Sequence, residues 1–272
     1  MVSVRIGCNR VWVESYDRVP LHGNTKMTDS TSKRPKTTST HDEKEHALMD
    51  AIAQADQGRV FELLMAGVDP STTCREWRTP LQRAADKGLD NIVQLLLVAG
   101  AQVDCGIGSK RQSPLCLAAH WNRESTAKIL LAGGASPDVA DAEGLTPLHH
   151  TTLRGNTAIA ELLLDANADV SAKTNDGETA LHFLVDRYIN CAREKAGVGA
   201  AIRKTIQRLL DRGASIDEAD IDGQTPIQQA TKYKRKALME LLLTATESVP
   251  QSSTSGSPVP PVSDAQLSSA RL

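Results

Sequence analysis

Aromatic side chains are scarce in this sequence: three Trp, three Tyr and two Phe make up 3% of its 272 residues. Alanine and leucine are abundant instead. The length permits one or two domains. Because large aromatic side chains supply much of the buried area in a bulky core, their scarcity favours many small helices packed through small residues.

Long apolar runs are also missing. No run approaches the roughly 18 residues of a membrane-spanning helix, and the first residues lack the apolar segment of a secretory signal. The five cysteines are widely spaced and contain no CxxC pair, which disfavours a disulfide framework. The formal net charge of −2 disfavours nucleic acid as a partner. We therefore expect a reduced protein in the cytoplasm, the nucleus or both, without membrane contact.

Signatures of catalysis are absent as well. The sequence contains no phosphate-binding loop, no GxSxG and no kinase motif. Cys116 and His120 have the spacing of half a metal site on a helix, but no second pair at zinc-like spacing accompanies them. His41 and His46 flank acidic residues without forming HExxH. We expect no enzyme activity, no metal, no cofactor and no small-molecule substrate.

One unit recurs along the chain. In residues 146–178, Thr146 suits a helix N-cap and Pro147 the first helical position, while Gly155 and Asn167 suit two helix ends. Similar starts at residues 79, 113, 179 and 225 give spacings of 34, 33, 33 and 46 residues. Each helix is too short to be stable alone, so the copies must stack.

This unit resembles the ankyrin repeat, whose pattern contains an Asp-Gly turn, Thr-Pro-Leu-His, paired alanines, Gly, a Leu-Leu-Leu run and Gly-Ala-Asp. The resemblance covers roughly three quarters of the chain. It implies an all-α solenoid of about six helix-turn-helix units in residues 43–246. The expected units are about 43–78, 79–112, 113–145, 146–178, 179–224 and a cap at 225–246. In this family the His of the motif, here His149 and His182, is structural.

Two units depart from the pattern. In the first, we expect Gly58 to separate the two helices. In the fifth, 13 residues are inserted between the helices, and we expect a first helix to about Lys195, a break at Gly197 and Gly199, and a second helix ending at Leu210. The insert is either a specific contact site or a tolerated surface insertion.

Both ends of the chain are expected to be disordered, namely residues 1–42 and the Ser/Pro-rich residues 247–272. Residues 11–13 could form a short strand, but no segment that follows them is suited to pair with it. Met27 opens an ordinary polar tail, which leaves open whether residues 1–26 belong to the mature protein. The basic run at 33–36 resembles a nuclear-import signal, and its alternative interpretation is a solvated linker.

The resemblance implies a non-catalytic module for protein–protein interaction, acting as a scaffold or regulatory adaptor through a concave groove. The alternatives are a substrate-recruiting subunit of a larger enzyme assembly, such as a ubiquitin ligase, kinase or phosphatase complex, and a nuclear regulator of transcription. In this family, partners contact the hairpin tips and the exposed ends of the first helices. At those positions stand Trp77, Arg78, Lys87, His120, Trp121, Leu153, Arg154, Arg187, Lys232 and Tyr233.

Trp77 and Trp121 stand where the family has small or polar residues, and Trp is common in binding hot spots. Trp77 has an alternative role, packing under a hairpin that lacks its turn Gly. Lys87, Arg154, Arg187 and Lys232 make the helical side of the groove basic, which suggests a partner segment with acidic residues. Asp86 and Asp186 reduce this basic character. We expect the chain to be a monomer.

Overall fold

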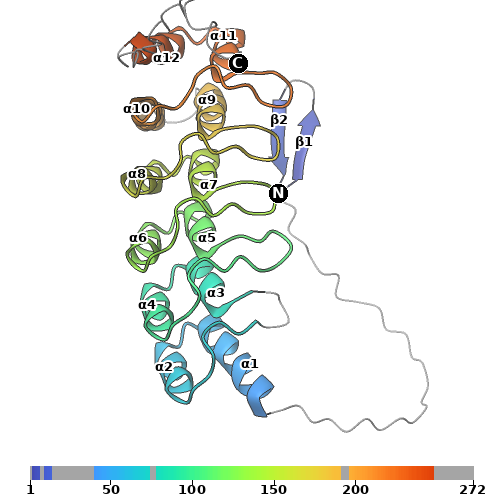
Figure 1. Cartoon of the computed structure of the whole chain (residues 1–272), viewed down its shortest axis with the longest axis vertical. Coiled ribbons are helices and arrows are strands. Elements are labelled where there is room, and N and C mark those ends of the chain that lie inside the picture. The colour runs from blue at the N-terminus through green and yellow to red at the C-terminus, as the bar shows by residue number, and fades with distance from the viewer. Residues whose placement is uncertain (1, 7–8, 14–39, 74–77, 191–195, 248–272) are drawn as a thin grey trace, which may run out of the picture. The chain divides into compact units, whose positions relative to one another are not determined.

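The computed structural model describes residues 2–6, 9–13, 40–73, 78–190 and 196–247 (Figure 1). Most of the two ends that we expected to be disordered lies outside these residues. The chain divides into two compact units, residues 1–37 and 38–272. In the first unit, β1 (Val2–Ile6) pairs antiparallel with β2 (Asn9–Val13), so that Val2 lies opposite Val13. The expected strand therefore has a partner, and this partner precedes it in the chain.

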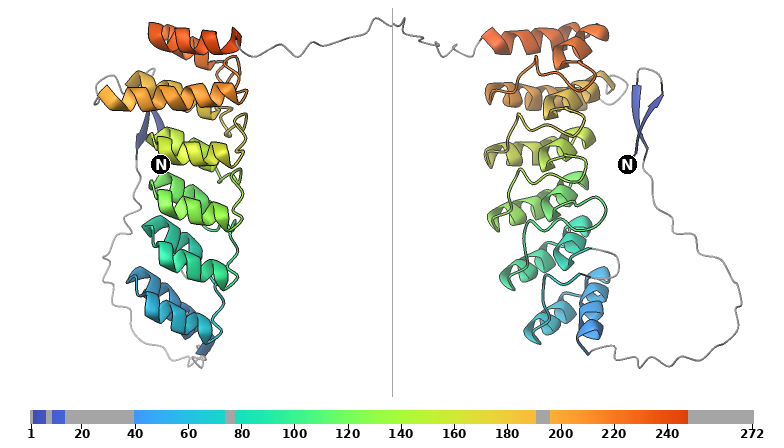
Figure 2. Two further views of the ribbon diagram at one scale, coloured as in Figure 1. Left: turned by 90° about the vertical axis from the view of Figure 1, so that its left-hand side faces the viewer. Right: turned by 45° about the vertical axis from the view of Figure 1, so that its right-hand side comes forward.

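In the second unit, the described residues form helices in successive pairs, stacked one pair upon the next (Figures 1 and 2). The first helices of the pairs are α1 (Thr40–Ala53), α3 (Pro80–Lys87), α5 (Pro114–His120), α7 (Pro147–Arg154), α9 (Ala180–Asn190) and α11 (Pro226–Lys232). The second helices are α2 (Gln57–Met65), α4 (Asp90–Val98), α6 (Glu124–Ala132), α8 (Thr157–Asp165), α10 (Ala196–Asp211) and α12 (Lys236–Glu247). The predicted all-α solenoid is confirmed.

Local chemistry explains the helix ends. The Thr146 hydroxyl accepts a hydrogen bond from the backbone N–H of His149, and Pro147 fills the first helical position. Gly155 ends α7 in the left-handed conformation, with φ of 74°. Asn122 and Asn167 take the same conformation at φ of 56° and 60°, as expected for the residue that most readily replaces Gly there.

Two predicted helix breaks are wrong. Gly58 lies inside α2, and the turn before it is made by Ala55, at φ of 57°, and by Asp56, whose side chain caps α2. Gly197 and Gly199 lie inside α10. They occupy its first turn, where backbone N–H groups lack intrahelical partners in any case. The cost of Gly in a helix, at most about 1 kcal/mol, is small beside the burial of the rest of α10 against its neighbours. Lys195 lies outside the described residues.

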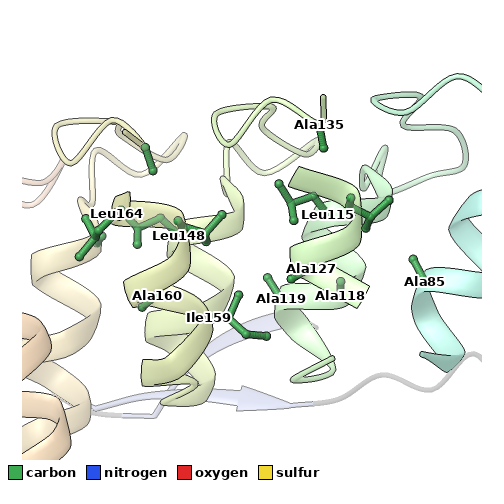
Figure 3. Close-up of a cluster of buried hydrophobic side chains, with 14 of the residues drawn as sticks. Ala85, Leu115, Ala118, Ala119, Ala127, Ala135, Leu148, Ile159, Ala160 and Leu164 are labelled. Carbon is green, nitrogen blue, oxygen red and sulfur yellow. The ribbon is translucent and has the colours of Figure 1, made fainter. Parts of the chain in front are cut away.

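The core runs through the stack between the two columns of helices. Leu115 and Leu148 of the first helices belong to this core together with Ile159 and Leu164 of α8, and all four are fully or almost fully buried (Figure 3). Small residues such as Ala119 permit close approach of the backbones. Each unit buries its apolar stripe against its neighbours, so no unit is expected to fold alone.

Candidate protein-binding surface

The ninth residue of units two to six, counted from the Thr or Ser that precedes the first helix, lies at the end of that helix or, in the fifth unit, in its last turn. These residues are Lys87, Trp121, Arg154, Arg187 and Tyr233. Because the first helices pack side by side in the stack, we call this set the end row. Adjacent packed helices generally lie about 8–10 Å apart.

Cations near the end row bind the ends of neighbouring helices. Lys87 Nζ donates to the carbonyl oxygen of Ala53 at 2.6 Å, and Arg235 Nη2 donates to that of Ile189 at 2.8 Å. The last carbonyls of a helix lack intrahelical donors and carry partial negative charge. A basic side chain from the next unit therefore caps each of these helices. Such contacts to neutral carbonyls hold the side chains in place and leave their positive charge intact.

Glycines at the helix ends make room for these side chains. A Cβ atom on Gly155 would lie 3.2 Å from Nε of Arg187, and one on Gly88 would lie 2.7 Å from Cδ of Arg123. Arg123 Nε also donates to the carbonyl oxygen of Asp86 at 3.4 Å. Sequence reasoning missed Arg123, because it precedes a second helix and matches no motif position.

Trp121 is the most exposed aromatic residue of the end row, at 41%. Its ring meets the His120 ring edge-on, with centroids 5.0 Å apart. His120 Nε2 lies 2.7 Å from Arg154 Nη2 and accepts from it. Burial, followed by the charges of His150 and Arg154, lowers the pKa of His120 to about 3. The imidazole of His120 is therefore neutral. It packs against the Trp121 ring on one side and accepts a hydrogen bond from the charged guanidinium of Arg154.

The other predicted residues are more dispersed. Arg78 pairs with Asp86 at 3.1 Å, and Leu153 is half-buried beside Arg154. Lys232 Nζ lies 5.8 Å from the centre of the Tyr233 ring, at the far end of the row. Trp77 lies outside the described residues. The structure thus places five of the ten predicted residues on the end row.

The hairpin tips are tied to each other by backbone hydrogen bonds. The N–H of Ala142 donates to the carbonyl oxygen of Lys110 at 2.9 Å, and that of Asn175 donates to Glu143 at 3.0 Å. The N–H of Ile221 donates to Asp176 at 3.0 Å. These bonds join successive tips, so the loops form a connected edge next to the first helices.

The motif histidines are buried and bonded within the fold. Burial lowers the pKa of His149 to about 4, and its Nδ1 accepts from the N–H of Thr146 at 3.2 Å. His182 Nδ1 accepts from the N–H of Thr179, and its Nε2 donates to the carbonyl oxygen of Gln224 in the next loop at 3.1 Å. Both side chains hold loops and helix starts together, in agreement with a structural role.

One buried cluster resembles a catalytic arrangement. His150 Nε2 donates to Asp141 Oδ2 at 3.0 Å, and Cys116 lies close enough to the imidazole to affect its charge. The Cys116 side chain is fully buried, and its thiol donates to the carbonyl oxygen of Val139 at 3.4 Å. A nucleophile must reach its substrate, so this cluster is structural. Within the part of the chain that the structure describes, no three His, Cys, Asp or Glu residues could together hold a metal ion.

The His150–Asp141 pair is charged. Burial lowers the pKa of His150, but the hydrogen bond to Asp141 and the neighbouring Cys116 outweigh burial and raise it to about 9. Burial raises the pKa of Asp141, but the bond from His150 and those from the N–H groups of Leu145 and Glu143 outweigh it and lower the pKa. The carboxylate thus joins the loop at 141–145 to α7.

No helix among the described residues is both long and apolar enough to cross a membrane. With the buried histidines assigned structural roles, the candidate binding surface consists of the end row and the adjacent edge of joined hairpin tips. Such a surface is suited to an extended or folded protein segment, because it offers repeated contacts over several units.

A family model described as ankyrin repeats (3 copies) matches residues 48–141 and 125–194, which together span more than half of the chain. The chain belongs to the ankyrin repeat family. Ankyrin repeats generally mediate protein–protein interaction, and their fold is typically a non-catalytic module.

Among curated proteins, B-cell lymphoma 3 protein from Homo sapiens is 32% identical over 163 residues, which cover 57% of this chain and 33% of that protein. SH3 and multiple ankyrin repeat domains protein 2 from Homo sapiens is 30% identical over 200 residues, covering 72% and 10%. The chain therefore spans a third or less of the length of these relatives.

Among solved structures, the crystal structure of the ankyrin repeat protein EF0377 is similar, with a TM-score of 0.64 and 22% identity. The similarity covers 73% of this chain and 97% of that one. It shows the shared fold.

Proposed function

We propose that this chain is a scaffold or regulatory adaptor that binds a partner protein along the end row, with Trp121 at the centre of the contact. The observation that carries the proposal is the exposure of Trp121, 41%, on a ring that packs edge-on against His120, which itself accepts a hydrogen bond from Arg154. A large, rigid and half-exposed aromatic residue beside a guanidinium is typical of a binding hot spot.

Electrostatics supports an acidic partner segment. Lys87 donates to a neutral carbonyl oxygen, so this contact does not cancel its positive charge. Asp86 also lies near the row, but it is paired with Arg78. Charges of this kind act mainly on the rate of association and on the choice of partner.

The chain is expected to act as a monomer in the cytoplasm or the nucleus. Cys105 and Cys116 are free thiols, which agrees with a reducing compartment.

The test is capture of partner proteins from native lysate by the full chain and by two variants. Trp121→Ala removes the proposed anchor. Leu243→Ala is the matched control, because Leu243 is also exposed, at 49%, but lies on α12 away from the end row. We expect Trp121→Ala to weaken binding about 30-fold, the ratio that corresponds to a hot spot of about 2 kcal/mol. Leu243→Ala should bind as the unmodified chain does.

Equal capture by all three proteins would refute the role of the end row. Circular dichroism spectra of the three chains show whether a loss of binding comes from a loss of fold.

A further inference from the structure

Large apolar side chains are exposed on the second helices of the first two units. Phe61 and Met65 lie about one turn apart on α2, with exposed fractions of 51% and 72%. Val98, with an exposed fraction of 90%, is the last residue of α4, as Met65 is of α2. Ala132, also exposed, ends α6. We call these four residues the apolar strip.

The apolar strip lies along the column of second helices. α2, α4 and α6 stack on the side of the repeats away from the hairpin loops (Figure 1). The ends of neighbouring second helices approach each other closely, because a Cβ on Gly133 would lie 2.8 Å from Cδ1 of Leu97. The strip therefore continues from one unit to the next, and it is separate from the end row, which belongs to the first helices.

The repeat does not need apolar residues at these positions. In the fourth and fifth units, the last residues of the second helices are Asp165 and Asp211. Asp165 Oδ1 accepts from Arg208 Nη2 at 2.6 Å, so an ion pair joins α8 and α10 there. Since charged residues serve at the same position of later units, stacking does not explain Met65 and Val98. Contiguous exposed apolar surface is typical of a site of interaction.

Size and charge indicate what covers the strip. Its three large side chains expose on the order of 300 Å² of apolar surface, taking about 150 Å² for each whole side chain. A stable interface between two copies needs about 800 Å² from each, so the strip suits one short segment. Bordering charges are paired with each other, Arg59 with Glu62 at 2.8 Å and Lys128 with Glu124 at 2.7 Å. This pairing favours an occupant with an uncharged contact face.

The spacing of the strip favours a helical occupant. Packed helices generally lie about 8–10 Å apart, and seven residues of a helix advance about 10.5 Å. Residues seven apart also lie on the same face of a helix, because two turns contain about 7.2 residues. Each heptad of a helix that lies along the strip therefore brings one apolar face to the next unit. In an extended segment, successive residues point to opposite sides, and three residues per unit would not keep one face toward the strip.

We infer that the apolar strip binds an amphipathic helix of a partner protein, whose apolar residues recur at heptad spacing and contact Phe61, Met65 and Val98. Helix binding to an apolar surface is an established mode of peptide recognition. The flexible thioether of Met65 accommodates side chains of different shapes. This inference goes beyond the proposed function, because it assigns a second surface on the other column of helices.

A library of displayed peptides tests the pattern. Each peptide has about 18 residues, which span about 27 Å as a helix and cover three helix ends. In the test set, Leu, Ile, Met, Val or Phe occupy positions 1, 4, 8, 11, 15 and 18, with Ala, Gln and Lys elsewhere. The control set contains the same residues in shuffled order. The full chain should enrich the test set. In fluorescence anisotropy, the enriched peptides should bind at least about tenfold tighter than their shuffled counterparts, a difference of about 1.4 kcal/mol.

Substitutions locate the binding surface. Met65→Asp and Val98→Asp each introduce the residue that α8 and α10 carry at the same position, so the repeat tolerates it. Each should weaken binding of the enriched peptides about fivefold or more. Ile221→Asp is the matched control, because Ile221 is also exposed, at 67%, but lies in a loop between α10 and α11. It should leave peptide binding unaltered. Circular dichroism spectra show that the variants are folded.

Equal enrichment of the two sets, enrichment of neither, or binding that is unchanged in both strip variants overturns the inference. Light scattering tests the other occupant, a second copy of the chain. A dimer that Val98→Asp dissociates would assign the strip to that copy and would also overturn the inference. Capture of partner proteins by Trp121→Ala is a separate measurement, so the end row and the apolar strip can fail independently.

Discussion

The buried His150–Asp141 pair makes the stability of this protein depend on pH in a defined window. The pKa of His150 is about 9 in the folded chain and about 6.5 in an unfolded chain. A raised pKa means that the folded state binds the proton more tightly. The stabilisation is therefore fully present below pH 6.5 and is lost as the pH rises to 9. At about 1.4 kcal/mol for each pH unit, the free energy of unfolding should fall by about 3 kcal/mol across this window.

Other histidines, His149 and His120 among them, act in the opposite direction. The pKa values of His149, about 4, and His120, about 3, are lowered chiefly by burial. Their contribution to the stability of the fold is present above pH 6.5 and is lost as the pH falls through their folded-state pKa values. Stability should therefore be greatest near pH 6.5 and decline on both sides.

The perturbation is His150→Leu. Leu117 occupies the same position in the preceding unit and is buried there, so Leu suits this site. Asp141 keeps its bonds from the N–H groups of Glu143 and Leu145. We expect the variant to lose the decline between pH 6.5 and 9 and to keep the decline below pH 6.5. The assay is urea denaturation followed by circular dichroism at several pH values.

The control is His46→Leu, which removes an exposed histidine on α1. It should retain the full slope between pH 6.5 and 9. If His150→Leu also retains that slope, His150 is not the titrating group and the charged pair does not exist.

Three further predictions concern stability in urea at pH 6.5. Gly155→Ala should destabilise the fold by about 1–2 kcal/mol more than Gly100→Ala. Both positions have positive φ, but only at Gly155 does a new Cβ meet a neighbouring side chain, that of Arg187. Equal losses of stability would show that the guanidinium of Arg187 moves aside freely. Thr146→Ala should cost about 1 kcal/mol because the N-cap bond to α7 is lost, and an unchanged midpoint would contradict this. Leu163→Ala, at a fully buried site, should cost about 2–5 kcal/mol, whereas Leu243→Ala at the surface should cost less than about 0.5 kcal/mol.

The sequence pattern places the residues of the predicted interface on helix ends, but it does not predict the bonds between them. The sequence pattern places Trp121 and Arg154 at the same position of successive units, so their alignment could be read without a structure. It contains no sign that Arg154 donates to His120 or that Lys87 caps α1. Those bonds depend on the reach of one side chain across the stack, and no local spacing records that distance.

The difference between local sequence preference and tertiary packing also explains the two wrong helix breaks. Gly favours a helix end on intrinsic grounds, and Gly155 ends α7 as expected. Gly58 and Gly197 carry the same local preference, yet both lie within helices. The packing of α2 and α10 against neighbouring helices outweighs a preference of at most about 1 kcal/mol.

The sequence by itself determined the repeating unit, its capping residues, its buried stripe and the need to stack, because these follow from backbone conformation and helical periodicity within about 33 residues. The tertiary structure alone decided which groups meet between units: Arg187 over Gly155, and His150 against Asp141. The physical reason is that a contact between units depends on the pitch of the stack and the rotamers of two distant side chains, and these are set only when the helices pack together.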